Sequence, residues 1–380
     1  MRRITAGLVA TAALAAVAFQ TVHAEDASSR VIVSTTLNDT LQLFDASTLA
    51  ELQPPLPSRG GGPVRLWVQD IDQQTYLFAA NHGVAIGSVG VFDLSGDLVT
   101  ELPLSPFPAR PGSVGITATE DSVFITNTYH ALAGCDVPAG TVGIYDTRML
   151  PTLGVLIEEQ TFDVSGAQPW AVSVDPTSDR AFVSSNCSDT LDSVNTGGII
   201  ATRATGNGPD ATVWDAAHGL NLTVNISGSS VSVHDAASPG ALTTIPLPGA
   251  RPIDATLAES PGGARWLITS NGGDDSISLV DRDLIAACVD EAAMSCDAEV
   301  ARIQTAVPGG APEGVAYDPV TNRAFVVNKT FPPSLSVIQL TEHPDGAVTG
   351  SDIAQIPLNA LGTSVPIPGI IAFDVVIQTR

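Results

Sequence analysis

A short pattern that recurs along this chain limits its possible folds more than any other feature. A proline is followed by about six residues typical of a β-strand and then by an aspartate. The clearest copies are Pro169–Asp175, Pro209–Asp215, Pro312–Asp318 and Pro368–Asp374. Looser copies begin at Pro63, Pro111 and Pro252, so the prolines recur every 40 to 60 residues. Repeats of this length are typical of solenoids and propellers.

Each copy contains further strand-like segments after the first. A second segment tends to end in asparagine, as at Asn127, Asn225, Asn271 and Asn328, and a third closes on a turn residue, as at Asp235 and Asp281. Fourth segments are weaker, for example Leu98–Leu104 and Leu242–Leu247. Four strands per unit indicate the blades of a β-propeller. Seven copies in residues 25–380 of the 380-residue chain give about 51 residues per blade, a length typical of propellers.

The two ends of the repeat predict a closed ring. Residues 31–52 supply strands two to four of a blade without a first strand, and the last copy is a first strand with nothing after it. The C-terminal strand, Ile370–Ile377, should therefore complete the blade that begins at Val31. Closure of this kind removes exposed sheet edges. We expect an all-β fold, a single seven-bladed β-propeller of four-stranded blades closed by the C-terminal strand.

The unit of strand, asparagine, short turn, strand and aspartate is clearest in Asn225–Asp235 and Asn271–Asp281. It resembles the YVTN-type repeat of seven-bladed bacterial propellers, and the resemblance covers nearly the whole chain after residue 24. Phe-Ile-Thr-Asn127 is the closest copy of the signature itself. The chain is more distantly similar to the methylamine dehydrogenase heavy chain and the haem-d1 domain of nitrite reductase, which implies redox roles by analogy only.

Residues 1–24 have the pattern of a secretory signal peptide. Arg2 and Arg3 precede an alanine-rich apolar stretch, and Val22-His23-Ala24 supplies a small-residue cleavage motif. We therefore expect the propeller to occupy residues 25–380, and the protein to be periplasmic or secreted. No later segment approaches the roughly 20 apolar residues of a membrane-spanning helix.

The charge balance excludes one class of partner. The chain has 40 acidic and 16 basic residues, with a net charge of -24. Nucleic acid binding needs a basic surface that this sequence lacks. The acidic surface would suit a basic protein partner, including a cytochrome. We expect a monomer whose partner is an unidentified protein or small molecule.

Four cysteines in an exported chain favour two disulfides. Three pairings are possible. Cys135 and Cys187 follow the second strands of consecutive blades, and Cys288 and Cys296 enclose a short alanine-rich segment. We predict the pairs Cys135–Cys187 and Cys288–Cys296, with a metal or redox site as the less favoured reading.

The mouth of the central channel is the predicted ligand site. Residues around the repeat prolines should line it: Arg110, Trp170, Asp210, Arg251, Asp254 and Glu313. Arg110 and Arg251 could hold a carboxylate or phosphate, or they could pair with the acidic residues. His82 and His130, from adjacent blades, could be two ligands of a metal, or exposed loop residues.

Other residues that could take part in catalysis also have structural interpretations. The recurring aspartates Asp175, Asp215, Asp318 and Asp374 share one phase, which is typical of turn formers. Lys329, the single lysine, is expected in a solvated loop. No catalytic motif of a serine hydrolase, zinc protease, nucleotide-binding loop or haem attachment is present.

These observations favour an exported, non-catalytic propeller that binds a ligand or protein through its loop face and channel mouth. No cofactor is expected on this reading. The alternative is a periplasmic propeller enzyme, a metal-assisted lactonase, lyase or hydrolase with a divalent metal, or a propeller subunit of a redox complex.

Overall fold

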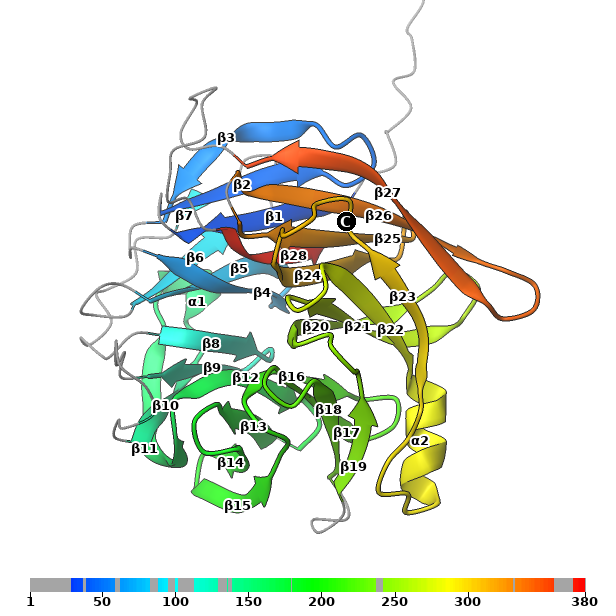
Figure 1. Cartoon of the computed structure of the whole chain (residues 1–380). Helices are drawn as coiled ribbons and strands as arrows, with labels where there is room; N and C mark the ends of the chain where they lie inside the picture. Colours follow the sequence, from blue (N-terminus) through cyan, green and yellow to red (C-terminus); the bar gives the residue numbers. More distant parts are fainter. Residues whose placement is uncertain are drawn as a thin grey trace, which may run out of the picture.

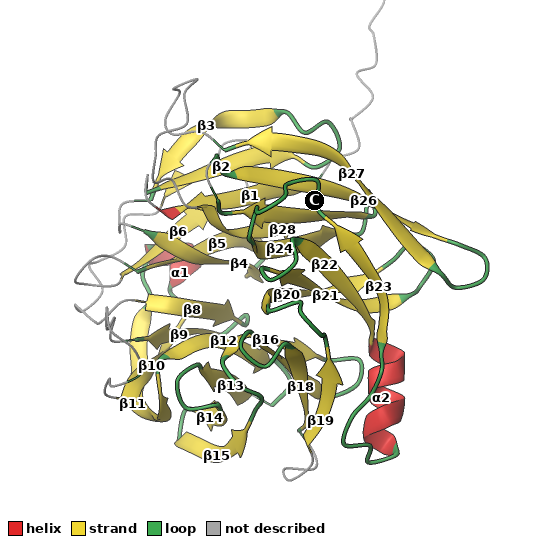
Figure 2. Cartoon of the chain, in the orientation of Figure 1, coloured by secondary structure: helices red, strands yellow, loops and turns green. Residues whose placement is uncertain are grey.

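The computed structural model describes residues 29–379 apart from 37–38, 59–61, 83–87, 95–99, 102–112, 129–134, 136–138, 179, 237–241, 331 and 359–371. Its strands form seven four-stranded antiparallel sheets arranged as a ring (Figure 1). The predicted seven-bladed β-propeller is confirmed. Within the described ranges there are two short helices, and strands dominate the rest (Figure 2).

The blades follow the chain in order from the second onward. Blade 1 contains β28 (Ala372–Gln378), β1 (Arg30–Thr35), β2 (Thr40–Asp45) and β3 (Glu51–Pro57). Blade 2 contains β4 (Pro63–Ile71), β5 (Gln74–Asn81), β6 (Ser88–Asp93) and β7 (Thr100–Glu101). Blade 3 contains β8 (Ser113–Ala118), β9 (Ser122–Asn127), β10 (Ala139–Asp146) and β11 (Ile157–Ala167), with α1 (Leu150–Leu153) before β11. Blade 4 contains β12 (Pro169–Asp175), β13 (Arg180–Ser185), β14 (Thr190–Asn195) and β15 (Gly198–Ala204).

The remaining blades repeat this order. Blade 5 contains β16 (Pro209–Asp215), β17 (Leu220–Asn225), β18 (Ser230–Asp235) and β19 (Leu242–Pro246). Blade 6 contains β20 (Pro252–Glu259), β21 (Arg265–Asn271), β22 (Ser276–Asp281) and β23 (Glu299–Gln304), with α2 (Arg282–Asp290) between the last two. Blade 7 contains β24 (Pro312–Asp318), β25 (Arg323–Asn328), β26 (Ser334–Glu342) and β27 (Val348–Pro357).

The C-terminal strand closes the ring as predicted. β28 pairs antiparallel with β1, with Val31 opposite Ile377 and Ile32 opposite Val376. The first blade is thus made from both ends of the described chain. Among the described residues, no helix is long and apolar enough to cross a membrane.

Apolar side chains between neighbouring blades form the core. One cluster joins Val31 and Val375 of blade 1 to Phe325 and Val337 of blade 7, and similar clusters join other neighbours. Blades 4 and 5 meet through Phe182 stacked on Trp214, with ring centroids 5.2 Å apart. Neighbouring blades cover both faces of each sheet. For this reason many strands are buried along most of their length.

The repeat asparagines fasten second strands to third strands. The amide of Asn225 donates to the hydroxyls of Ser230 and Ser232, at 3.1 and 2.9 Å. Asn271 and Asn328 make the equivalent pairs of bonds in blades 6 and 7. A buried amide needs such partners, so the Asn–Ser pattern is a structural feature of the blade.

Both predicted disulfides are present. Cys135–Cys187 joins the connection after β9 to the connection after β13, and so links blades 3 and 4. Cys288–Cys296 joins α2 to the segment that leads into β23. Asp281 caps α2, because its carboxylate accepts the backbone N–H groups of Asp283 and Leu284.

Candidate functional site

The innermost strand of each blade lines a central channel, because it contacts the innermost strands of both neighbouring blades and these contacts run around the whole ring. Five of these strands begin with a proline that lies opposite the last residue of the second strand, as Pro63 lies opposite Asn81. Ser113 and Ala372 hold the same place in β8 and β28. Two residues further on, the seven blades contribute a ring of residues: Asp374, Arg65, Gly115, Ala171, Ala211, Asp254 and Gly314.

The structure corrects the alignment of the last repeat. Pro368 lies outside the described residues, and the pairing of Ala372 with Thr35 places Asp374 at the position of Arg65 and Asp254. Asp374 is therefore a channel residue and not a turn former. Asp175 does hold a turn, since its carboxylate accepts the N–H of Thr177 at 3.0 Å. Asp215 and Asp318 do the same with residues two places on.

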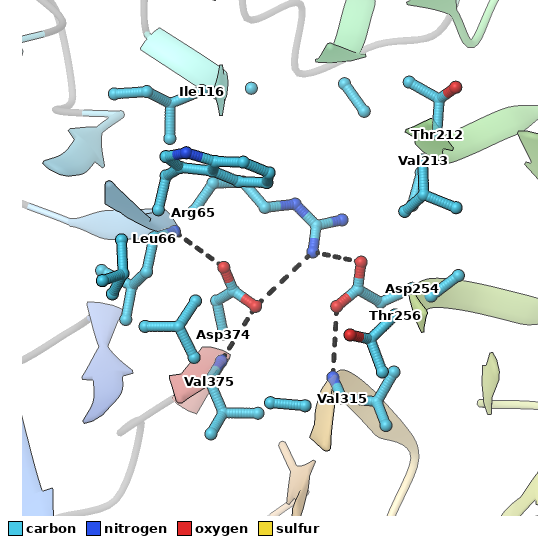
Figure 3. A pocket seen from close by; sticks show the side chains of 18 of the residues that line it. Arg65, Leu66, Ile116, Thr212, Val213, Asp254, Thr256, Val315, Asp374 and Val375 are labelled. Carbon is cyan, nitrogen blue, oxygen red and sulfur yellow. Dashed lines mark hydrogen bonds and ion pairs between the residues drawn. The ribbon is translucent and has the colours of Figure 1, made fainter. Parts of the chain in front are cut away.

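A cavity of about 250 Å³ occupies the channel beside this ring. Glycine and alanine at four of the seven ring positions leave room that larger side chains would fill. Figure 3 shows the Arg65 side chain reaching between Asp374 and Asp254, with Thr212 and Val213 on the other side of the cavity. The charged groups of blades 1, 2 and 6 thus converge on one space.

Arg65 is the central cation of the site. Its Nη1 lies 3.0 Å from Asp254 Oδ1 and 3.9 Å from Asp374 Oδ1. Burial by itself lowers the pKa of Arg65, but the surrounding carboxylates, led by Asp254, outweigh burial and raise it. Arg65 Nη2 is buried and has no hydrogen-bond partner within the described part of the chain. An unpaired buried guanidinium donor is costly unless a ligand or water accepts from it.

Backbone N–H groups hold the two aspartates, and each aspartate accepts one of them from the next blade. Asp374 accepts the N–H of Leu66 at 2.7 Å and that of Val375 at 2.8 Å. Asp254 accepts the N–H of Val315 at 3.1 Å. The inner edges of β4 and β24 therefore help to position both carboxylates, and the N–H of Val375 in β28 adds a second bond to Asp374.

Several carboxyl groups of this cluster hold protons unusually tightly. Burial raises the pKa of Asp374 to about 7, helped by repulsion from Asp254 and opposed by Arg65. Burial also raises the pKa of Asp210 to about 7, opposed by Arg65 and helped by Glu313. Burial likewise raises the pKa of Glu313. Carboxyl groups with a pKa of about 7, as at Asp374 and Asp210, can give and take protons near neutral pH.

Lys329 corrects another expectation from the sequence. Its Nζ lies 2.7 Å from Glu313 Oε2, so it is an ion-pair partner of the cluster and not a solvated loop lysine. Two cations, Arg65 and Lys329, face four carboxyl groups, those of Asp210, Asp254, Asp374 and Glu313. This excess of acids favours proton uptake by the cluster.

The predicted site residues are only partly brought together. Asp210, Asp254 and Glu313 gather around Arg65. Trp170 is half-buried in β12 and Arg251 is exposed at the start of β20, and neither is among the described residues that line the cavity. Arg110 lies outside the described residues.

The predicted metal pair cannot be assembled from the described residues. His82 is half-buried after β5, and its backbone N–H donates to Gly62 at 2.8 Å. His130 lies outside the described residues. Within the described part of the chain, no group of three or more His, Cys, Asp or Glu side chains is placed to hold a metal ion.

The sequence interpretation missed Arg65 and Asp374. Arg65 follows Pro63 by two residues, as Asp254 follows Pro252, so a comparison of equivalent repeat positions could have found it. Asp374 cannot be found in this way, because it lies six residues after the nearest repeat proline, Pro368, and not two.

Comparisons with known proteins identify the fold. No family model matches the chain, and no curated protein matches it. A periplasmic gluconolactonase of Pseudomonas aeruginosa is 16% identical, with a TM-score of 0.64 over 87% of this chain and 97% of that one. A Bacteroides fragilis protein, named provisionally as a 6-phosphogluconolactonase, is 12% identical, with a TM-score of 0.66 over 93% and 98%. Hydrazine synthase of Kuenenia stuttgartiensis is 14% identical, with a TM-score of 0.59 over 85% and 92%.

These comparisons correct the leading functional prediction. Similar structures named as lactonases overturn the reading of a non-catalytic binding module, and with it the expectation that the chain is not an enzyme. They favour the alternative prediction, a propeller enzyme of the lactonase type. At these identities the likeness itself shows the seven-bladed fold, and activity needs an argument from the site.

Proposed function

We propose that the protein is a hydrolase that opens lactones in the central channel. The observation that carries the proposal is the buried Arg65, held between Asp254 and Asp374 at the wall of a 250 Å³ cavity. This arrangement supplies a fixed cation and a carboxyl group with a pKa of about 7. Hydrolysis of an ester needs both kinds of group.

The groups have distinct roles in this mechanism. The Asp374 carboxylate takes a proton from a water molecule as that water attacks the lactone carbonyl carbon. Arg65 donates to the carbonyl oxygen as it becomes negative, and Asp254 fixes the guanidinium in place. The ring C–O bond then breaks, and the proton held on Asp374 passes to the leaving oxygen. One water is consumed, and the product is a hydroxy acid.

The names of similar structures support this class of substrate, since two of them refer to gluconolactone or its phosphate. Membership of the YVTN-type repeat family rests on the repeat alone. The two disulfides support export. We also propose cleavage after residue 24 and a monomeric product, to be tested by intact mass and native mass spectrometry.

The direct test measures lactone hydrolysis by the purified protein, as acid released at constant pH. The probes are glucono-δ-lactone and δ-valerolactone, with spontaneous hydrolysis subtracted and the metal content determined by elemental analysis. We expect Arg65→Met and Asp374→Asn each to lower kcat by about 100-fold or more. Asp290→Asn, at the exposed end of α2, is the matched control and should retain activity.

The pH dependence gives a second check. Because the base must be deprotonated, kcat/KM should rise with pH through about 7, the pKa of Asp374. Absence of hydrolysis with both lactones, or full activity in Arg65→Met, would overturn the proposal.

A further inference from the structure

The channel continues beyond the charged ring into a second cavity of a different character. This cavity has a volume of about 270 Å³. Its walls include the apolar side chains of Trp67, Val174, Val213, Trp214 and Leu257. It adjoins hydroxyl groups of Ser173, Thr212 and Thr256. We refer to these eight residues as the aromatic pocket.

The aromatic pocket adjoins the cavity beside Arg65, which we call the charged cavity. Trp67, Thr212, Val213, Ala255 and Thr256 line both of them. Arg65 and Asp254 lie two residues after their repeat prolines, whereas Trp214 and Leu257 lie five residues after theirs. Three residues of a β-strand span about 10 Å. One ligand of that length can therefore touch both the charged and the apolar end.

Trp214 adds a specific binding group to the apolar end. Its indole ring is held by stacking on Phe182, with an interplanar angle of 13°. Its Nε1 is buried without a hydrogen-bond partner among the described residues. A buried indole N–H usually finds an acceptor, so a ligand carbonyl or ether oxygen could supply one.

We propose that the substrate is a lactone that carries an apolar substituent, with the lactone ring at Arg65 and the substituent in the aromatic pocket. This inference rests on the proposed lactonase function and specifies its substrate class. A polyhydroxylated sugar lactone would leave the apolar walls in contact with hydroxyl groups, which is unfavourable. An alkyl chain would instead cover the apolar walls and remove them from water, which is favourable.

The test compares two lactones with the same six-membered ring, δ-valerolactone and δ-decalactone, which differs from it by a pentyl group. We expect kcat/KM at least about tenfold higher for δ-decalactone, since even one methylene in an apolar pocket is worth about that factor. Leu257→Trp should fill the aromatic pocket and remove this preference. Leu257 lines this pocket and not the cavity beside Arg65, so activity on δ-valerolactone should stay within about twofold. Val174→Thr, at another residue that lines the aromatic pocket and not the cavity beside Arg65, keeps the volume and should reduce the preference without blocking the channel.

A binding measurement separates this inference from the proposed function. The probes are the corresponding lactams, piperidin-2-one and 6-pentylpiperidin-2-one, with calorimetry as the readout. Tighter binding of the pentyl lactam that Leu257→Trp abolishes supports the aromatic pocket even if no lactone is hydrolysed. Hydrolysis of δ-valerolactone with no gain from the pentyl group, in rate or in binding, would overturn the inference and leave the lactonase intact.

Discussion

Replacing Asp210 with asparagine should stabilise the protein at pH 8 much more than at pH 5. Burial raises the pKa of this carboxyl from 3.8 to about 7 in the folded protein. The folded state therefore holds a proton that the unfolded state releases between these two pH values. Because the folded state binds more protons, stability falls as pH rises through this window.

The magnitude follows from the size of the shift. One pKa unit corresponds to about 1.4 kcal/mol, so ionising Asp210 in the folded protein costs about 4 kcal/mol in all. Part of this cost is already present at pH 5, and about 3 kcal/mol is added between pH 5 and pH 8. Asparagine matches the shape of the protonated acid and does not titrate, so the variant escapes the added cost.

Urea denaturation of wild type and Asp210→Asn at both pH values measures the effect. The free energy of unfolding of the variant, relative to wild type, should increase by about 3 kcal/mol from pH 5 to pH 8. Asp290→Asn, from the exposed end of α2, controls for the loss of one negative charge. A difference between Asp210→Asn and wild type that is the same at both pH values would refute the reasoning.

Three further outcomes are expected. The double replacement of Cys135 and Cys187 by serine should lower the free energy of unfolding by about 4 kcal/mol, since the bridge closes a loop with a sequence separation of 52; unchanged urea denaturation would contradict this. Arg282→Met should cost about 3 to 5 kcal/mol in the same assay, because it leaves the buried carboxylate of Asp215 without its bond from Arg282 Nε at 2.9 Å. Removing β28 (Ala372–Gln378) should expose the edge of β1 and cause aggregation in size-exclusion chromatography; a monomeric product with unchanged melting would refute ring closure by this strand.

The number of blades, their four-stranded form and the closure of the ring could be predicted from the sequence. Each blade is a unit of about 50 residues whose strands pair with near neighbours in the chain, so alternation and turn residues specify it locally. The disulfides were predictable for a related reason. Cys135 and Cys187 hold equivalent places in consecutive repeats, and Cys288 and Cys296 are close in sequence.

The acidic members of the site were partly predictable, because Asp210 and Glu313 stand directly after repeat prolines and Asp254 stands two residues after one. The role of Lys329 was not predicted. The expectation of a solvated lysine did not consider that its long side chain could reach the carboxylate of Glu313. Its ion pair with Glu313 follows from the pairing of Asn328 with Pro312, which brings the residue after β25 beside the start of β24.

The tertiary structure alone decided that Arg65 and Asp374 form the centre of the channel. Asp374 reaches the backbone of Leu66 only because the last strand of the chain is placed beside blade 2 when the ring closes. Its place along the strand is set by pairing with β1 rather than by the nearest proline. Asp374 therefore lies near the start of its strand, beside the channel, whereas Asp175 and Asp215 end their strands. A local repeat thus determines the blades, whereas a site assembled from blades 1, 2 and 6 depends on long-range strand pairing.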